Sequence, residues 1–217
     1  PMLIQPNLFP PLHPYNWTTI GSPEDLDSAS LDDIKDFFRK FYSPSNASLA
    51  IVGDFDPSEV RSQVEQYFGE IPAAPAVDRV GRMDSKLSGQ VSLTTHDRVQ
   101  LPRLYLVWPT GPMFDSDHAP LDLMASILGD GKSSRLYRTM VHDRQIAREV
   151  RVEHYAQEIA GEFSIQVTAN PGHSLDELET VIAEELELMK SEPPTAEELT
   201  RAKTRIETSH VMQLERF

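Results

Sequence analysis

The sequence EFSIQVTA, residues 162–169, alternates polar and apolar side chains without a break. Because successive side chains of a strand point to opposite faces, this pattern predicts a β-strand with one face in the core and the other partly exposed. The apolar residues Val150 and Val152 precede a turn near residues 160–161. The two segments are therefore predicted to pair as an antiparallel hairpin.

Three further segments have the composition of strands. Residues 47–52 are mostly apolar, residues 91–95 alternate apolar and polar side chains, and residues 103–108 form another apolar run. Runs of this length and composition are typical of buried or half-buried strands. Residues 71–82 show neither a strand period nor a helix period, so they indicate a linker.

Capping residues mark the predicted helix starts. Ser30, Asp56, Ser174 and Thr195 each precede an amphipathic stretch and have an acidic residue three positions later. Another helix is predicted from about residue 118, with a break at residues 129–131. Strands covered by helices on one side define an α+β fold, with antiparallel-rich sheets backed by helices. The side chains expected to be buried are Phe37, Phe38, Phe41, Phe68, Leu106, Phe163 and Ile165.

The composition excludes several kinds of partner. The chain has 217 residues, 39% of them hydrophobic and 25% charged, as in ordinary globular proteins. Lys and Arg number 20 against 34 Asp and Glu, and the net charge of −14 opposes binding to nucleic acid or to anionic lipid. No apolar run approaches the roughly 20 residues that a transmembrane helix needs. We therefore expect no nucleic acid and no membrane among the partners.

The histidines show no spacing that is typical of a zinc site. The chain contains seven histidines, and the smallest gap between two of them is the 12 residues from His142 to His154. Two imidazoles on one helical face must be about four residues apart to reach the same zinc ion. A site built from distant histidines has no support from spacing. There is no cysteine, which excludes thiolate ligands and thiol nucleophiles. The sequence predicts no metal ligand and no catalytic residue.

Gly131-Lys132-Ser133 allows a nucleotide-binding interpretation, because a phosphate-binding loop has the pattern G-x-x-x-x-G-K-[ST]. The first glycine of that pattern would fall at Ser126, and the preceding segment is predicted to be a helix. A helix break, with Ser133 or Ser134 capping the next segment, is the alternative that agrees with the surrounding sequence.

Asp115, Asp117 and His118 are close enough in sequence to contribute to a cation site. Three clustered residues make an incomplete coordination shell. Asp117 directly precedes the first periodic residues of the predicted helix, which is the position of an N-cap. We expect the capping role for Asp117.

Four stretches carry a resemblance to a known family. They are HPYNWTTIG at residues 13–21, NASLAIVGDF at 46–55, YFGEIP at 67–72 and GDGKSSRLY at 129–137. Their order and spacing resemble the insulinase/pitrilysin zinc metallopeptidases, in particular the bacterial two-repeat branch. Nearly the whole chain takes part in the resemblance, but the inverted zinc motif H-x-x-E-H is absent. The chain is therefore expected to be a fragment that lacks the zinc motif.

The resemblance implies a set of repeated domains like those of the mitochondrial processing peptidase. Residues 1–76 would be the C-terminal part of the metal-bearing domain, residues 77–84 a linker, and residues 85–217 most of the second, non-metal domain, truncated at its C-terminal end. Zinc is implied for the parent protein and no cofactor for this fragment. The location implied is the bacterial periplasm, with the cytoplasm as the alternative.

The resemblance also implies a function. The chain would form part of the chamber that encloses a peptide in a zinc metalloendopeptidase, without zinc ligands or a general base, and would be inactive alone. The alternative is a non-catalytic partner or structural module of the same fold. The partners implied are a peptide or unfolded polypeptide substrate and the missing repeat or a partner subunit.

The residues expected to face the substrate are Arg135 and Arg148. In the insulinase branch, an Arg and a Tyr seven residues later contact the peptide from the second domain. The matching positions here are Val141 and Arg148, so neither residue type is retained. Arg148 could still pair with a peptide carboxylate. The alternative for Arg148 is an ordinary solvent-facing arginine.

Overall fold

The computed structural model describes residues 3–83, 85 and 87–215. The chain divides into two compact units, one formed by Pro1–Trp17 together with Gly81–Phe217 and the other by Thr18–Val80. The boundary near residue 80 falls within the predicted linker, residues 77–84. Each unit is described by itself.

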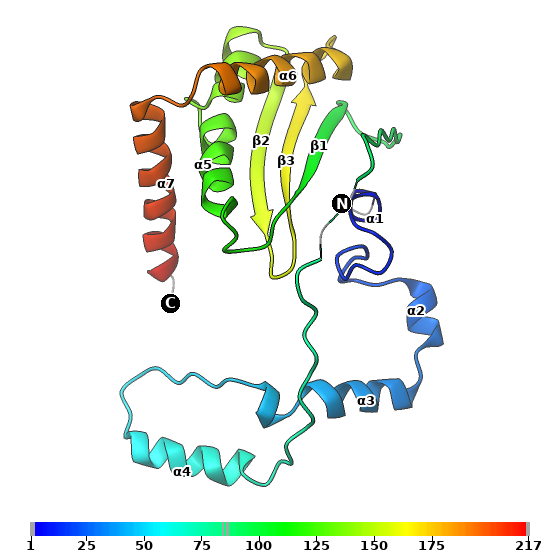
Figure 1. Cartoon of the computed structure of the whole chain (residues 1–217), viewed down its shortest axis with the longest axis vertical. Coiled ribbons are helices and arrows are strands. Elements are labelled where there is room, and N and C mark those ends of the chain that lie inside the picture. The colour runs from blue at the N-terminus through cyan, green and yellow to red at the C-terminus, as the bar shows by residue number, and fades with distance from the viewer. Residues whose placement is uncertain (1–2, 84, 86, 216–217) are drawn as a thin grey trace. The chain divides into compact units, whose positions relative to one another are not determined.

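A three-stranded antiparallel sheet forms the centre of the larger unit (Figure 1). Its strands are β1 (Arg103–Thr110), β2 (Ala147–Ala156) and β3 (Gly161–Ala169), in the order β1-β3-β2. Ile165 of the central strand faces Leu106 on one side and Val152 on the other. The hairpin and the strand predicted at residues 103–108 are confirmed.

Four helical segments accompany the sheet: α5 (His118–Gly129), the π-helix η2 (Tyr137–Asp143), α6 (Leu175–Ser191) and α7 (Ala196–Leu214). Helix α5 packs against β2, α7 packs against α5, and α6 contacts β1 and β3 (Figure 1). The hydroxyls of Ser174 and Thr195 accept hydrogen bonds from the backbone N–H groups of Glu177 and Glu198, so both predicted N-caps are confirmed. The architecture is the predicted α+β class.

The core of the larger unit lies between the sheet and these helices. Phe163 and Ile165 of β3 are 3% and 0% exposed, as predicted, while Leu106 of β1 is only partly buried. Helix α5 contributes Leu128. The other buried members of this core are Ala125, Leu136, Met140, Ile146, Ala147, Val150, Val152, Val167, Ala169, Leu178, Val181 and Ile182.

An N-terminal arm belongs to the same unit and contains α1 (Gln5–Leu8). His13 in this arm is fully buried and stacks on Phe9, with ring centroids 4.4 Å apart. Its Nδ1 accepts a hydrogen bond from the backbone N–H of Tyr15 at 3.0 Å, so its Nε2 is the donor to the carbonyl of Met83 at 3.3 Å. Leu8 and Phe9 pack against Ala160 at the hairpin turn. The His-Pro-Tyr stretch is therefore a packing element.

The smaller unit consists of short helices: α2 (Pro23–Ser28), α3 (Leu31–Phe41), the 3-10 helix η1 (Pro44–Asn46) and α4 (Pro57–Phe68). Two of its helix starts agree with the prediction. Ser30 and Asp33 form a complete capping box, and the Asp56 carboxylate accepts hydrogen bonds from two backbone N–H groups of α4. These short-range signals need no tertiary partner, which is why the sequence reports them reliably.

The predicted core of the smaller unit is wrong. Phe37, Phe38 and Phe68 are 51%, 51% and 49% exposed, and Phe41 is only partly buried. Residues 47–52 and 91–95 are not strands. Within the described chain no other segment pairs with them, and a strand needs the backbone hydrogen bonds of a neighbour. Periodicity indicates which side chains of an element share an apolar face. It does not indicate whether another segment of the chain covers that face.

Candidate functional site

The candidate site is the segment from the end of α5 to the start of β2, residues 129–148. At Gly129 a β-carbon would lie 2.4 Å from the side chain of Val152 and 2.8 Å from its backbone nitrogen, so the close approach of α5 to β2 requires glycine. Gly131 has φ +83, a conformation that favours glycine. The predicted helix break at residues 129–131 is confirmed, and it turns the chain away from the axis of α5.

The chain resumes its helical path at residue 135 and then widens into η2. Neither predicted serine caps this segment. The Ser134 hydroxyl is buried and donates a hydrogen bond to the carbonyl of Gly131 at 2.7 Å. This bond closes the turn at residues 131–134, directly before the helix that begins at residue 135. Helix, not a strand, precedes Gly131-Lys132-Ser133, so the phosphate-loop interpretation is excluded by its surroundings.

Arg135 and Glu198 form a largely buried ion pair between this segment and α7. Arg135 Nε and Nη2 donate to the two carboxylate oxygens of Glu198 at 2.7 and 2.9 Å, and Arg135 Nη1 donates to the carbonyl of Glu192 at 3.3 Å. The two side chains are only 15% and 16% exposed. The hydrogen bonds from Arg135, aided by the backbone N–H of Thr195, lower the pKa of Glu198 to about 2. The same pairing raises the pKa of Arg135.

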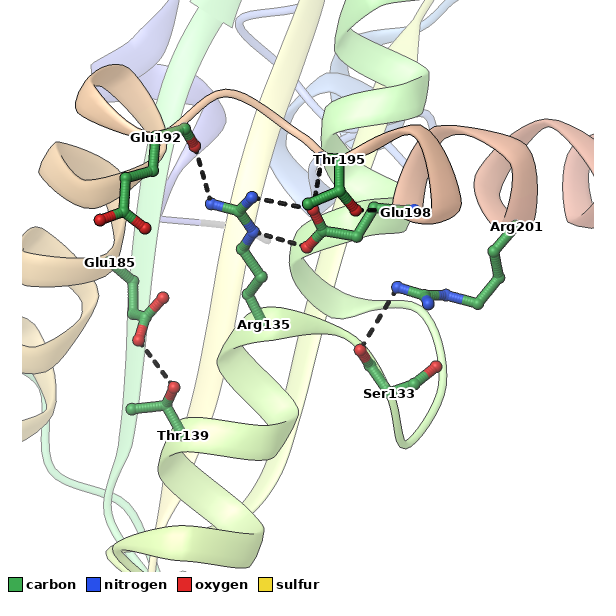
Figure 2. Close-up of polar contacts among 8 residues, drawn as sticks. All are labelled: Ser133, Arg135, Thr139, Glu185, Glu192, Thr195, Glu198 and Arg201. Carbon is green, nitrogen blue, oxygen red and sulfur yellow. Dashed lines mark hydrogen bonds and ion pairs between the residues drawn. The ribbon is translucent and has the colours of Figure 1, made fainter.

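Three residues of helix α7 contact the turn at residues 129–135. Besides Glu198, Arg201 Nη2 donates to the carbonyl of Ser133 at 3.4 Å, and Arg205 forms an ion pair with Asp130. Residues 198, 201 and 205 are three and four positions apart, so they share one face of the helix. Figure 2 shows Glu198 and Arg201 pointing from α7 toward Arg135 and Ser133. The turn is therefore fixed by α7 and is not a free loop.

Helix α6 holds the next part of the segment. The Thr139 hydroxyl donates to Glu185 Oε1 at 2.6 Å (Figure 2), and Arg144 Nη2 donates to Glu184 Oε2 at 2.9 Å. A π-helix is an uncommon irregularity that often accompanies function. These two side-chain contacts connect η2, and the residue that follows it, to α6.

Arg148 differs from Arg135 in its surroundings. It lies at the register shift of β2 between Ala147, which pairs with Ala169 of β3, and Glu149, which pairs with Thr168. Its side chain is exposed, and within the described chain it has no hydrogen bond or ion pair. Val141, which aligns with the family's substrate-contacting arginine, packs partly buried against the core. Of the two predicted substrate-facing residues, only Arg148 therefore has a guanidinium available for another molecule.

The side chains of the three residues weighed as cation ligands do not form one group of potential ligands. Asp115 pairs with Arg82 at 2.8 Å. Asp117 has a helical backbone conformation and makes no side-chain capping bond, so its predicted capping role is wrong. His118 lies beside Asp122 and His154 instead, in the one group of three potential ligands found among the described residues. The spacing of His118 and Asp122 could have been noticed in a predicted helix, but His154 joins them only because α5 packs on β2.

Neither predicted arginine lines the hollow of about 620 Å³ that lies along α6. That hollow is bordered by acidic side chains of one helix face, which include Asp176, Glu179 and Glu187. In the described part of the chain, no helix has the length and apolar character that crossing a bilayer requires.

Comparison with known proteins identifies the class to which this fold belongs. A family model described as the peptidase M16 inactive domain matches residues 28–206. The chain belongs to this family, and the resemblance to insulinase-type peptidases that the sequence predicted is confirmed.

The relatives include bacterial zinc proteases. Zinc protease PqqE of Helicobacter pylori is 27% identical over 206 residues, which cover 94% of this chain and 46% of PqqE. An uncharacterized zinc protease of Streptomyces coelicolor, SCO5738, is 26% identical over 202 residues, covering 90% of this chain and 44% of the relative. The crystal structure of a protease from Helicobacter pylori matches with a TM-score of 0.79 and 26% identity, covering 94% of this chain and 50% of the other. The chain spans about half the length of these relatives.

The residues of this chain do not fit the zinc centre of such a peptidase. H-x-x-E-H places two histidines four positions apart on one helix, with a glutamate between them that can act as general base. No such pair occurs in the sequence, and among the residues that the structure describes, the histidine pair that meets a carboxylate comes from a helix and a strand. No step of peptide hydrolysis is therefore assigned to these residues.

Proposed function

We propose that the chain is the non-catalytic part of a bacterial zinc metalloendopeptidase and forms part of the wall that encloses the peptide. Support comes from the family match and from relatives that are named zinc proteases. Residues 1–76 would complete the metal-bearing domain and residues 85–217 would form most of the second domain, joined by the linker 77–84. The zinc ligands and the general base would lie upstream, in the rest of the metal-bearing domain, and the missing repeat or a partner subunit would pair with this chain.

The observation that carries the role in substrate binding is the contrast between the two arginines. Arg135 has its donors committed to Glu198 and Glu192, whereas Arg148 is exposed and unpaired within the described chain. A guanidinium forms short, charge-assisted hydrogen bonds with a carboxylate. Arg148 binds a carboxylate of the peptide, and Arg135 holds the turn at residues 129–135 in place through Glu198.

The test uses the complete protein that contains this chain, with its zinc-bearing half present. Arg148→Ala should raise KM for an acidic peptide about tenfold and leave kcat nearly unchanged, because it removes binding that the ground state and the transition state share. Arg151→Ala on the same strand is the control, since Arg151 is paired with Glu153 at 2.6 Å. Equal KM values for Arg148→Ala and the unaltered protein would refute the assignment.

The second candidate is a non-catalytic partner or structural module of the same fold, whose parent lacks H-x-x-E-H altogether. The two candidates differ in the sequence adjacent to this chain in the parent. An intact H-x-x-E-H there supports the endopeptidase, and its loss supports the partner module. The periplasmic location stays a prediction that fractionation of the source cells would test.

A further inference from the structure

Two histidines and an aspartate meet between α5 and β2, away from the 129–148 segment. His118 and Asp122 lie one turn apart on α5, and His154 reaches them from β2. His154 Nδ1 is 2.7 Å from Asp122 Oδ1, and His118 Nε2 is 3.6 Å from Asp122 Oδ2. One potential ligand atom of each residue lies within 4.8 Å of the other two. Nothing in the proposed peptidase role uses these residues.

We propose that His118, Asp122 and His154 bind one divalent transition-metal ion of the zinc type. Two imidazoles and a carboxylate are an established zinc ligand set, with bonds of about 2.0–2.2 Å. The ligand atoms of a tetrahedral site lie roughly 3.3 Å apart at such bond lengths. His154 Nδ1 lies 2.7 Å from Asp122 Oδ1 and His118 Nε2 lies 3.6 Å from Asp122 Oδ2, so each imidazole is near that spacing from one of the two carboxylate oxygens. Side-chain movements of about 1 Å would complete the geometry, with water in the fourth position.

The surroundings of His154 support a metal ligand. Its side chain is only 1% exposed, so the ring is held by packing, and Phe163 lies beside it with centroids 6.4 Å apart. Its second nitrogen, Nε2, is 3.2 Å from the Thr110 hydroxyl. With a metal on Nδ1, Nε2 carries the ring proton and donates a hydrogen bond to the hydroxyl oxygen of Thr110. Hydrogen bonding at the far nitrogen is the usual way in which proteins orient a ligating histidine.

His118 must change one hydrogen bond to bind the ion. Its Nδ1 now accepts the backbone N–H of Phe114 at 3.2 Å, which places the ring proton on Nε2 and directs it toward Asp122. Metal binding through Nε2 moves that proton to Nδ1, so the N–H of Phe114 must turn to water. Phe114 lies in an exposed turn, where its side chain is 89% exposed and its φ is +67. The bond is therefore replaceable, and its loss reports occupancy of the site.

The ion would join α5 to β2 and stabilise the second domain without taking part in peptide hydrolysis. Each element supplies ligands, so the bound ion adds a link to contacts that the apolar core already makes. This inference does not depend on the proposed peptidase function, because the site contains only residues of this chain.

The experiment is a titration of the chelator-treated 217-residue chain with zinc sulfate, followed by calorimetry and by elemental analysis after dialysis. Cobalt(II) serves as a spectroscopic substitute, because its visible absorption distinguishes tetrahedral coordination. Asp122→Asn, His118→Ala and His154→Ala remove the ligands, and Thr110→Val removes the supporting hydroxyl. His173→Ala is the matched control: His173 also pairs with a carboxylate four residues on, Glu177 at 2.9 Å, but no third potential ligand joins them among the residues that the structure describes.

We expect one zinc per chain, affinity at least about tenfold lower in each ligand variant, and a loss of about 10–100-fold in Thr110→Val. His173→Ala should bind as the unaltered chain does, and the amide resonance of Phe114 should shift on zinc addition. His154→Ala removes a buried ring, so circular dichroism must show that this variant folds. If it does not fold, the affinities of Asp122→Asn and His118→Ala decide the question. Absence of saturable binding, or equal affinity in Asp122→Asn, would overturn the proposal.

Discussion

Arg135 and Glu198 lie 63 positions apart in the sequence and form a two-pronged ion pair, with donor–acceptor distances of 2.7 and 2.9 Å. Glu198 is also the N3 residue of the capping box that begins α7, with Thr195 as the N-cap. One carboxylate thus starts a helix and fixes the turn that follows α5. This double use makes the pair a sensitive point for stability.

The first prediction is a dependence of stability on Glu198 at low pH. The pKa of Glu198 in the folded chain is about 2, below its usual 4.5. A carboxyl whose pKa is depressed by folding contributes stability above the unfolded pKa and loses it as the pH falls through the folded pKa. The contribution should therefore be complete above about pH 5 and disappear progressively between pH 5 and 2.

Glu198→Gln should lower the free energy of unfolding at pH 7 by about 1.5–3 kcal/mol, the range for hydrogen bonds to charged groups. The difference from the unaltered chain should shrink toward pH 2. Urea melts across this pH range measure it, with Glu197→Gln as the neighbouring control. A difference that stays constant from pH 7 to pH 2 would argue against the ion pair as its cause.

The second prediction compares two phenylalanines. Phe163→Ala should cost about 3–5 kcal/mol, because truncating a packed phenylalanine leaves a cavity. Phe38→Ala should change the free energy of unfolding by less than about 0.5 kcal/mol, since its side chain is 51% exposed against 3% for Phe163. Urea melts of both variants provide the comparison. Similar losses at the two positions would show that Phe38 is covered in solution.

The third prediction concerns Gly131→Ala. The residue has φ +83, and an added β-carbon would lie 2.7 Å from Arg205 Nη1, so the substitution both strains the backbone and disturbs the pair of Arg205 with Asp130. It should cost more than about 1 kcal/mol. Gly89→Ala is the control, because a β-carbon there meets no atom within 4 Å. In the complete enzyme, Gly131→Ala should also weaken peptide turnover.

The fourth prediction is that the isolated chain cleaves no peptide, with or without added zinc. It lacks the H-x-x-E-H pair and the general base between the histidines. A fluorogenic peptide assay at increasing zinc concentration checks this. Bound zinc without turnover would agree with the site at His118, Asp122 and His154, whereas turnover that Asp122→Asn abolishes would contradict the non-catalytic assignment.

Sequence reasoning succeeded where the signal was local. The capping boxes at Ser30 and Thr195 and the glycine break at Gly131 appear in the structure. The strand β3 forms as predicted, but its polar face is not half exposed, because Ser164 and Thr168 are buried as well. Each depends on residues a few positions apart, so the pattern and its physical cause lie in the same stretch of chain.

It failed where the outcome depends on a distant partner. Residues 47–52 have strand composition but lack a paired neighbour in the described chain. The commitment of Arg135 to Glu198 and the meeting of His154 with His118 follow from how helices and strands pack. Neither the spacing nor the composition of the sequence contains that information.

The hydrogen bond from His13 to Met83 has a consequence for how the chain can be rearranged. It fastens two positions 70 residues apart, and the smaller unit, residues 18–80, lies entirely between them. Closing a flexible loop of this length costs on the order of 4 kcal/mol in chain entropy. The smaller unit is thus a continuous insertion between two segments of the larger unit, which end at residue 17 and resume at residue 81. A short glycine-serine linker that joins residue 17 to residue 81 could replace the smaller unit. Docking of the N-terminal arm would then cost much less chain entropy.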